Sequence, residues 1–285
     1  MTMDGAITVM THGRPEETNA ALLELAAMAA AHGATLRLDA EETAKHPSLA
    51  GMAAVACDAP LARDAALCVA LGGDGTILRA LRAYARTPVP VFAVNFGEVG
   101  FLSTVEPDQM RDGFERALAG RLELLRLPAI ELEGPAGTHT ALNDVSVHRK
   151  IGGRVAELSY AVGGEEVGSV RCDGLVVATP AGSTGYNLAN GGPVLAWGVA
   201  GMVVSFIAPH SLSARALVIA PDDVLTLNSS SRENLAISVD GRPVGEIAPE
   251  QSMLARFTHD VATLALLEGS SFYLRLREKF GRLSR

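Results

Sequence analysis

The sequence contains only three cysteines, Cys57, Cys68 and Cys172, and no Cys-x-x-Cys pair. An odd number of isolated cysteines argues against a disulfide framework and is typical of a reducing compartment. The sequence also lacks an apolar run long enough to span a bilayer. Its first residues lack the basic and apolar segments of a signal peptide. We therefore expect a cytoplasmic protein that has no membrane partner.

Other absences exclude several kinds of catalytic and metal-binding site. The seven histidines are scattered, so the sequence offers no ligand spacing for a structural metal. It contains neither a Gly-x-Ser-x-Gly elbow nor a His-Glu-x-x-His motif. Acidic residues outnumber basic ones by 32 to 24, which gives a formal net charge of -8. Because an acidic chain repels nucleic acid, we expect no nucleic-acid partner, and a phosphate-bearing ligand must be bound by a local group of donors.

The residues that are present predict two domains and a final helix. In residues 1–127, apolar strands at 6–10, 34–38, 65–71 and 89–94 alternate with helical segments. This alternation predicts an α/β domain with a mainly parallel sheet. In residues 128–267, short apolar runs lie between turn signals, which predicts a mainly antiparallel all-β domain. Residues 268–285 include a serine cap and late basic residues, which indicate a helix.

The segment LGGDGTILRA, residues 71–80, follows an apolar strand and opens a helix. Its glycines allow a sharp turn and a close ligand approach, and amides at the start of a helix bind phosphate oxygens. We therefore assign Gly72, Gly73 and Thr76 to a phosphate loop. The segment is neither a Walker A loop, since no Gly-Lys-Ser/Thr follows, nor a dinucleotide fingerprint, since Leu78 replaces the third glycine.

Asp74 distinguishes this loop from other phosphate loops. A carboxylate among phosphates is electrostatically unfavourable unless it holds a metal ion or accepts a proton from a hydroxyl group, and both are kinase roles. A structural alternative is that Asp74 caps the helix in a tight turn. A second glycine loop, NFGEVGFLST at residues 95–104, is either a ligand rim or an ordinary loop.

Two later segments carry polar groups suited to a nucleoside. Asn143 can read an adenine edge and Asp144 can accept from ribose hydroxyls, although Asn-Asp is also common in turns. The segment RCDGLVVATPAGSTGYNLANGGP, residues 171–193, is dense in small and hydroxyl residues on which a flat ring could lie. Arg171 suits a phosphate or carboxylate, and Asp173 suits a hydroxyl or amino group. A β-domain loop rich in turn formers is the alternative. The segment SVDGR, residues 238–242, predicts a hairpin turn.

Together these motifs resemble the NAD kinase family. The order is GGDGT, NxGxxGFL, ND, DGLxxxTPxGSTxY…GGP, PHSLSAR and DG, and the similarity extends from about residue 65 to residue 281. GGDGT alone also occurs in phosphofructokinases and in diacylglycerol and sphingosine kinases, whereas the TPxGSTxY block with PHSLSAR is specific. The resemblance implies phosphorylation of the adenosine 2′-hydroxyl of NAD, with ATP or polyphosphate as donor and Mg²⁺ as divalent metal. It also implies a β-sandwich second domain, a last helix that packs on the first domain, and a homodimer or homotetramer.

The resemblance further implies roles for individual residues. Asp74 would accept the proton of the 2′-hydroxyl, with Gly75 beside it. The substrate-binding residues would be Asn143, Asp144, Arg154, Arg171, Asp173, Thr184, Gly185, Tyr186, Asn187, Leu188, Ala189, Ala208 and Arg242. The usual TPTGSTAYSLSAGGP reads TPAGSTGYNLANGGP here, so the side chains at positions 181, 185, 187, 189 and 190 depart from the family pattern.

Two alternatives stay open on the sequence. A lipid or sugar kinase could share the glycine loop, but the apolar or basic membrane-facing patch of a lipid kinase is not evident. A non-catalytic nucleotide sensor could share the scaffold, but it would have little need of Asp74.

Overall fold

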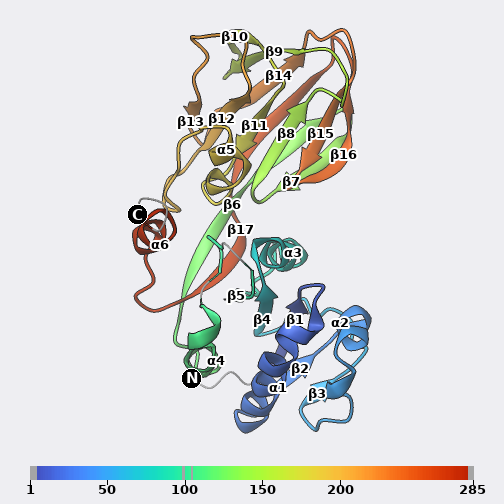
Figure 1. Ribbon diagram of the computed structural model, residues 1–285, viewed down its shortest axis with the longest axis vertical. Coiled ribbons are helices and arrows are strands. Elements are labelled where there is room, and N and C mark those ends of the chain that lie inside the picture. Colours follow the sequence, from blue (N-terminus) through green and yellow to red (C-terminus); the bar gives the residue numbers. More distant parts are fainter. Residues whose placement is uncertain (1–4, 98–99, 104, 282–285) are drawn as a thin grey trace. The chain divides into compact units, whose positions relative to one another are not determined.

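Figure 1 shows the computed structural model, which describes residues 5–97, 100–103 and 105–281. The chain divides into two compact units. The first comprises the chain up to Arg126 together with the segment from Ala262 onward, and the second comprises Leu127–Val261. Two long strands, β6 (Leu122–Gly134) and β17 (Ser252–Leu267), each contribute residues to both units. Residues 262–267, which we expected in the β domain, therefore belong to the first unit.

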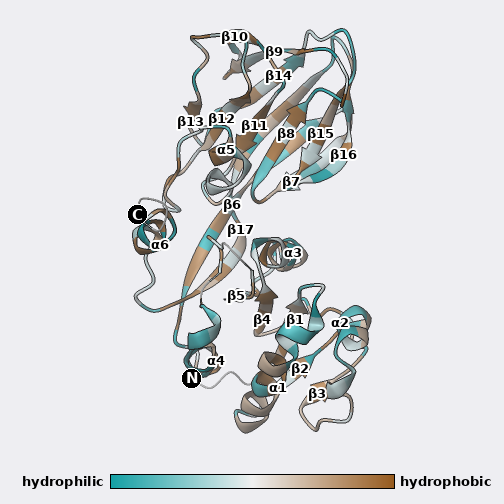
Figure 2. Ribbon diagram, viewed as in Figure 1, coloured by the Kyte–Doolittle hydropathy of each residue, from teal (hydrophilic) through white to brown (hydrophobic). Residues whose placement is uncertain are grey.

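The first unit contains a parallel sheet in the order β3-β2-β1-β4-β5. Ile7 in β1 pairs with Leu36 on one side and Leu67 on the other, and the last part of β17 joins β5 through Leu264 and Val91. All residues of β4 and β5 are buried, as in strands covered on both faces, and β4 is brown in Figure 2. The bounds are β1 Ala6–Thr11, β2 Thr35–Arg37, β3 Val55–Ala56, β4 Leu67–Gly72 and β5 Val91–Asn95.

Helices cover this sheet through apolar faces. Leu22 and Leu25 of the first helix are buried, and the Phe114 ring of the fourth packs 6.5 Å from that of Phe92. The third helix begins at Asp74, because Gly73 has the extended backbone of an N-cap. The second helix was not predicted, because six residues are too few for a periodic signal. The bounds are α1 Pro15–Ala31, α2 Ala40–Lys45, α3 Asp74–Ala83, α4 Met110–Leu118 and α6 Phe272–Phe280, with 3-10 turns at Pro47–Leu49 and Pro107–Gln109.

The strand order of the first unit indicates where a ligand would bind along the edge of its sheet. β1 leads to β2 on one side, whereas β4 and β5 lie on its other side. In open parallel sheets, ligands bind beyond the carboxyl ends of the strands at the point where this order reverses. Thr11 ends β1 and Gly72 ends β4, so the segments after these two residues meet at that point.

The second unit is an antiparallel sandwich. One sheet has the order β13-β12-β11-β8-β15-β16, and the other includes β10-β9-β14-β17. Val147 and Leu175 from the first sheet share one buried core with Leu158 and Leu227 from the second. The expected turn at Asp240-Gly241 is present, and a further turn lies at Gly163-Gly164; all four residues have positive φ angles. The bounds are β7 Gly137–Ala141, β8 Asp144–His148, β9 Ala156–Val162, β10 Glu165–Cys172, β11 Gly174–Ala178, α5 Tyr186–Ala189, β12 Met202–Ile207, β13 Leu217–Ile219, β14 Leu225–Ser229, β15 Leu235–Val239 and β16 Arg242–Ile247.

The last helix, α6, packs within the first unit. Its Phe280 ring lies 5.9 Å from the ring of Phe101, and Lys279 forms an ion pair with Glu106. Residues 282–285, which we included in the expected helix, lie outside the described residues. In the part of the chain that the structure describes, no helix is long and apolar enough to cross a membrane. The α/β first domain, the all-β second domain and the final helix are thus confirmed.

Candidate functional site

A depression of about 430 Å³ lies where β1 and β4 end in the first unit. Four glycines expose their backbone to this depression, and His12 and Arg14 contribute basic side chains. The lining residues are His12, Gly13, Arg14, Gly73, Gly75, Thr76, Phe96 and Gly97. The N-terminus of α3, which is the positive end of the helix dipole, lies at this depression, because its N-cap Gly73 is one of the lining residues. Amides at a helix start together with an arginine favour a bound phosphate.

The two glycine loops of the first unit touch each other. A Cβ atom added to Gly97 would lie 2.9 Å from the Cα atom of Gly73, so the approach of the two loops requires glycine at position 97. The Phe96 amide donates to the carbonyl oxygen of Gly72 over 3.2 Å. Phe96 and Gly97 of the second glycine segment thus lie against Gly72 and Gly73 of the first. Glu98, Val99 and Thr104 of the second segment lie outside the described residues.

Asp74 is the first residue of α3, but its side chain does not cap the helix. Instead its Oδ2 atom accepts from the Phe101 amide and its Oδ1 atom from the Leu102 amide, each over 3.1 Å. A Cβ atom on Gly100 would lie 3.3 Å from Asp74 Oδ1 and 2.7 Å from Ser103 Oγ, so this close approach also depends on glycine. The interpretation of Asp74 as a helix cap is therefore wrong.

Opposing effects act on the acidity of Asp74. Burial raises its pKa, whereas the amides of Phe101 and Leu102 and the charges of Lys279 and Arg275 lower it. Burial outweighs the rest, so the pKa of Asp74 lies above its ordinary value. A carboxylate with a raised pKa is the stronger proton acceptor.

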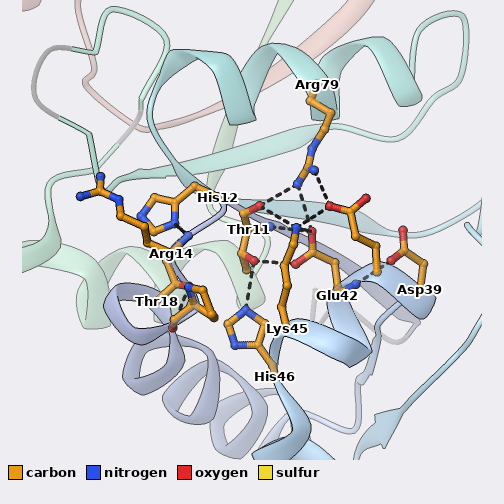
Figure 3. A network of polar contacts seen from close by, with 11 residues as sticks. Thr11, His12, Arg14, Thr18, Asp39, Glu42, Lys45, His46 and Arg79 are labelled. Atoms are coloured by element: carbon orange, nitrogen blue, oxygen red, sulfur yellow. Dashed lines mark hydrogen bonds and ion pairs between the residues drawn. The ribbon is translucent and has the colours of Figure 1, made fainter.

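A buried polar network lies beside the depression and joins β1, α2 and α3 (Figure 3). The Glu42 carboxylate is 1% exposed, and it accepts from the amide and the hydroxyl of Thr11 over 3.0 and 2.5 Å. It also accepts from Lys45 Nζ and Arg79 Nη2, each over 3.0 Å. Arg79 Nη2 donates in addition to the Thr11 carbonyl oxygen over 2.6 Å. The network fixes the end of β1 relative to α3, which carries Asp74.

His46 completes this network on the side away from Arg79. Its Nε2 atom lies 3.0 Å from Thr11 Oγ1. Burial lowers the pKa of His46, which keeps the ring neutral near pH 7. No sequence motif predicts this network, because the contacts that join β1 to α2 and α3 link residues 31 to 68 positions apart.

In the second unit, the Asn143-Asp144 turn and the 171–193 segment are joined. The Thr179 amide donates to the Asn143 carbonyl oxygen over 2.9 Å, and the Thr179 hydroxyl donates to the Leu142 carbonyl oxygen over 2.7 Å. A Cβ atom on Gly182 would overlap the carbonyl group of Asn143. The two nucleoside-type motifs of the sequence are thus in direct contact.

Asp240 holds this turn from the hairpin between β15 and β16. Its carboxylate accepts from three successive amides, those of Leu142, Asn143 and Asp144, over 3.2, 2.7 and 3.2 Å. The SVDGR motif predicts a hairpin turn, but it gives no sign that Asp240 supports a turn about 100 positions earlier in the chain. Burial first, and the charge of Asp240 second, raise the pKa of the buried Asp144 to about 7.

Two of the expected arginines line one cavity in the second unit. This cavity of about 770 Å³ is lined by Arg149, Gly153, Arg154, Val155, Glu157, Arg171, Ser231 and Arg232. Arg149 and Arg232 were not predicted. Arg149 donates two hydrogen bonds to Asp173, from Nε to Oδ1 over 2.6 Å and from Nη2 to Oδ2 over 3.3 Å. These bonds lower the pKa of Asp173. Four guanidinium groups around one cavity suit an anionic ligand.

The run 184–189 divides into exposed and buried positions. Gly185, Tyr186 and Ala189 are exposed, whereas Thr184 and Leu188 are half-buried. Asn187 is fully buried, and its Nδ2 atom donates to the carbonyl oxygens of Ser183 and Pro193 over 2.8 and 2.9 Å. These contacts give Asn187 a structural role, and its contact with substrate stays a prediction. Ala208, which has a φ of 43°, and Arg242 are both exposed.

Comparisons with known proteins identify the family. The family model for the ATP-NAD kinase N-terminal domain matches residues 23–122, and the model for the C-terminal domain matches residues 142–261. An NAD kinase of Gemmatimonas aurantiaca is 35% identical over 222 residues, which cover 75% of this chain and 76% of that protein. The chain belongs to the NAD kinase family. The resemblance inferred from the motifs is confirmed, and phosphorylation of NAD is its enzymatic activity.

Solved structures of NAD kinases confirm the fold. A crystal structure of yeast NADH kinase complexed with NADH matches with a TM-score of 0.85 at 21% identity, over 98% of this chain and 88% of that chain. A crystal structure of an NAD kinase from Archaeoglobus fulgidus in complex with ATP matches with a TM-score of 0.70 at 24% identity, over 98% of each chain.

The buried network of this NAD kinase generates a stability prediction. Glu42→Gln removes the buried carboxylate between Lys45 and Arg79, and both cations then keep their ion pairs with the exposed Glu41. We expect the free energy of unfolding to fall by about 3 kcal/mol, because the buried partner of two partly buried cations is lost. Glu41→Gln is the control, because that side chain is 62% exposed and its ion pairs contribute at most about 1 kcal/mol. Urea denaturation measures both variants, and equal small losses would contradict the role of Glu42.

The Asp144–Asp240 pair generates a pH prediction. Since the folded pKa of about 7 lies above the unfolded value, Asp144 contributes stability that is present below about pH 4 and is lost as the pH rises toward 7. Asp240→Asn removes a neighbouring negative charge, so we expect the pKa of Asp144 to fall. Carboxyl-carbon NMR titration measures this pKa, and Asp222→Asn, at an exposed turn, is the control. An unchanged pKa of Asp144 in Asp240→Asn would show that the two carboxylates do not interact.

Proposed function

We propose that this NAD kinase transfers the terminal phosphoryl group of ATP to the adenosine 2′-hydroxyl of NAD, with Asp74 as the group that accepts the hydroxyl proton. The observation that carries the proposal is the setting of the Asp74 carboxylate. It lies in a glycine loop at a helix start, and each of its oxygens accepts one amide hydrogen bond. Because a carboxylate oxygen has two lone pairs, an oxygen held in this way can still accept from a substrate hydroxyl.

The donor phosphates would bind in the depression at the ends of β1 and β4. Gly72, Gly73, Gly75 and Thr76 would supply the loop, with backbone amides directed at the phosphate oxygens. Arg14 adds a guanidinium group that can bind phosphate oxygens. Its Nη1 atom lies 2.6 Å from Glu17 Oε1, so an incoming phosphate would compete with this carboxylate for Arg14.

The divalent metal of the reaction would bind mainly to the phosphates. Among the residues that the structure describes, no three His, Cys, Asp or Glu side chains gather in a group that could hold an ion. Mg²⁺ carried by a nucleotide needs few protein ligands, so this arrangement fits a metal that arrives with ATP. When bound, Mg²⁺ neutralises charge on the phosphates, while Asp74 holds the hydroxyl proton.

The acceptor would be bound by side chains of the second unit. Asn143 and Asp144 would contact the adenosine, Tyr186 would stack on it or pack against it, and Asp173 would take a hydroxyl or amino group. Arg154 and Arg171 suit the pyrophosphate of NAD. Thr184, Gly185, Asn187, Leu188, Ala189, Ala208 and Arg242 complete the proposed contact set.

Polyphosphate is the second donor to be tested, because a chain of phosphates offers the depression the same oxygens as ATP does. We further propose that the enzyme acts in the cytoplasm as a homodimer or homotetramer. Incubation of the purified protein with NAD, Mg²⁺ and either donor, read by an NADP-specific dehydrogenase, compares the donors. Analytical ultracentrifugation gives the oligomeric state.

Asp74→Asn tests the proposed base. An amide cannot take the hydroxyl proton, so we expect kcat to fall by about 10² to 10⁴, while KM for NAD changes by only a few fold. Steady-state kinetics with ATP as donor measure both constants. Asp64→Asn, at an exposed position before β4, is the control and should behave as wild type. If Asp74→Asn keeps the wild-type kcat, the assignment of the base is wrong.

A further inference from the structure

The loop that holds Asp74 is itself held by the last helix. Arg275 on α6 donates from Nη1 to the Phe101 carbonyl oxygen over 3.3 Å. The amide of the same residue, Phe101, donates to Asp74. The backbone of Phe101 is therefore held at both of its polar groups: its N–H donates to the Asp74 carboxylate, and its C=O accepts from the Arg275 guanidinium.

Two further contacts of α6 secure the same loop. Lys279 Nζ lies 3.4 Å from Glu106 Oε1, and Glu106 Oε2 accepts from Asn95 Nδ2 over 3.0 Å. The Phe280 ring lies 5.9 Å from the ring of Phe101. The helix thus contacts both the middle of the loop, at Phe101, and its end, at Glu106.

Close packing does not fill the space between α6 and the loop. A cavity of about 250 Å³ lies there, and its lining includes Gly100, Ser103 and Glu106 from the loop side and Arg275 and Glu278 from α6. A loop that borders a cavity has fewer dispersion contacts to hold it in one place. Its position therefore depends more strongly on individual polar contacts such as that of Arg275.

The guanidinium of Arg275 also acts on Asp74 through its charge. Burial lowers the pKa of Arg275 to about 10, although Glu278, Asp74 and Glu106 act in the opposite direction. The group therefore stays positively charged near neutral pH. From α6, Arg275 and Lys279 both lower the pKa of Asp74.

We propose that Arg275 is a positioning residue for phosphoryl transfer: through the Phe101 carbonyl group it fixes the loop whose amides orient the Asp74 carboxylate. The inference rests on the proposed role of Asp74 as the base. Arg275 acts through Phe101 and Leu102 on the angle at which Asp74 meets the 2′-hydroxyl. A displacement of about 1 Å at such a group can cost about 10² in rate.

Arg275→Met tests this role, because methionine keeps the length and apolar stem of the side chain but removes both the donor and the charge. We expect kcat to fall by about 10- to 100-fold, with KM for NAD and for ATP within about threefold of wild type. The acid limb of the kcat–pH profile should move to higher pH, because the loss of a positive charge raises the pKa of Asp74. Lys279 and the two loop amides remain and limit the size of the shift.

Two further variants separate positioning from folding. Arg277→Met, at an exposed position of the same helix, should keep the wild-type kcat, pH profile and Tm. Arg275→Gln keeps a donor for the Phe101 carbonyl oxygen but no charge, so we expect a smaller loss of kcat with the shift of the acid limb retained. If Arg275→Met does not fold, Arg275→Gln tests the role of Arg275 in its place. A wild-type kcat and pH profile in Arg275→Gln would overturn the inference.

The double variant separates this inference from the proposed base. In an Asp74→Asn background, Arg275→Met should change the residual rate by less than about twofold, because Arg275 acts through Asp74. If Asp74→Asn alone keeps the wild-type kcat, the proposed base fails. If Asp74→Asn is impaired but Arg275→Met has the wild-type kcat and acid limb, or its full effect persists in the double variant, only the role of Arg275 fails.

Discussion

The Asp74 carboxylate accepts hydrogen bonds from two consecutive backbone amides, those of Phe101 and Leu102. The surrounding parts of the first unit hold the carboxylate and the two amides in position for these bonds. β4 ends at Gly72, directly before the start of α3. Glycine at position 97 lets its segment approach the Gly73 backbone closely, and glycine at position 100 leaves room for the side chains of Ser103 and Asp74. The network around Glu42 fixes α3 from one side, and α6 fixes the 100–103 loop from the other.

The second unit uses the same interaction with the roles exchanged. There the Asp240 carboxylate accepts from three successive amides, and the turn that donates them carries the proposed ligand residues Asn143 and Asp144. In the first unit the carboxylate is the proposed reactive group and the amides support it. In both cases the amides compensate for the loss of water around a negative charge, which would otherwise be costly to bury. Burial still outweighs this compensation at Asp74, whose pKa remains raised.

The sequence predicted those features that depend on local patterns. The alternation of strands and helices and the later turn-rich region were sufficient for both fold classes, and the order of six motifs was sufficient for the family. Contacts between distant positions could not be predicted in this way. Neither the Glu42–Arg79 pair nor the Arg275–Phe101 bond leaves a periodic or motif signal, because each joins residues that only the tertiary fold brings together. The same holds for Asp240, whose Asp-Gly pair is typical of an ordinary hairpin.

The central claim is that an amide-held Asp74 receives the proton of the adenosine 2′-hydroxyl. The most direct measurement is a crystal structure of the protein with NAD and a non-hydrolysable ATP analogue. We expect an Asp74 oxygen within hydrogen-bond distance of the 2′-oxygen, with the hydrogen bonds from the Phe101 and Leu102 amides retained. An Asp74 side chain turned away from every ribose oxygen in that complex would contradict it.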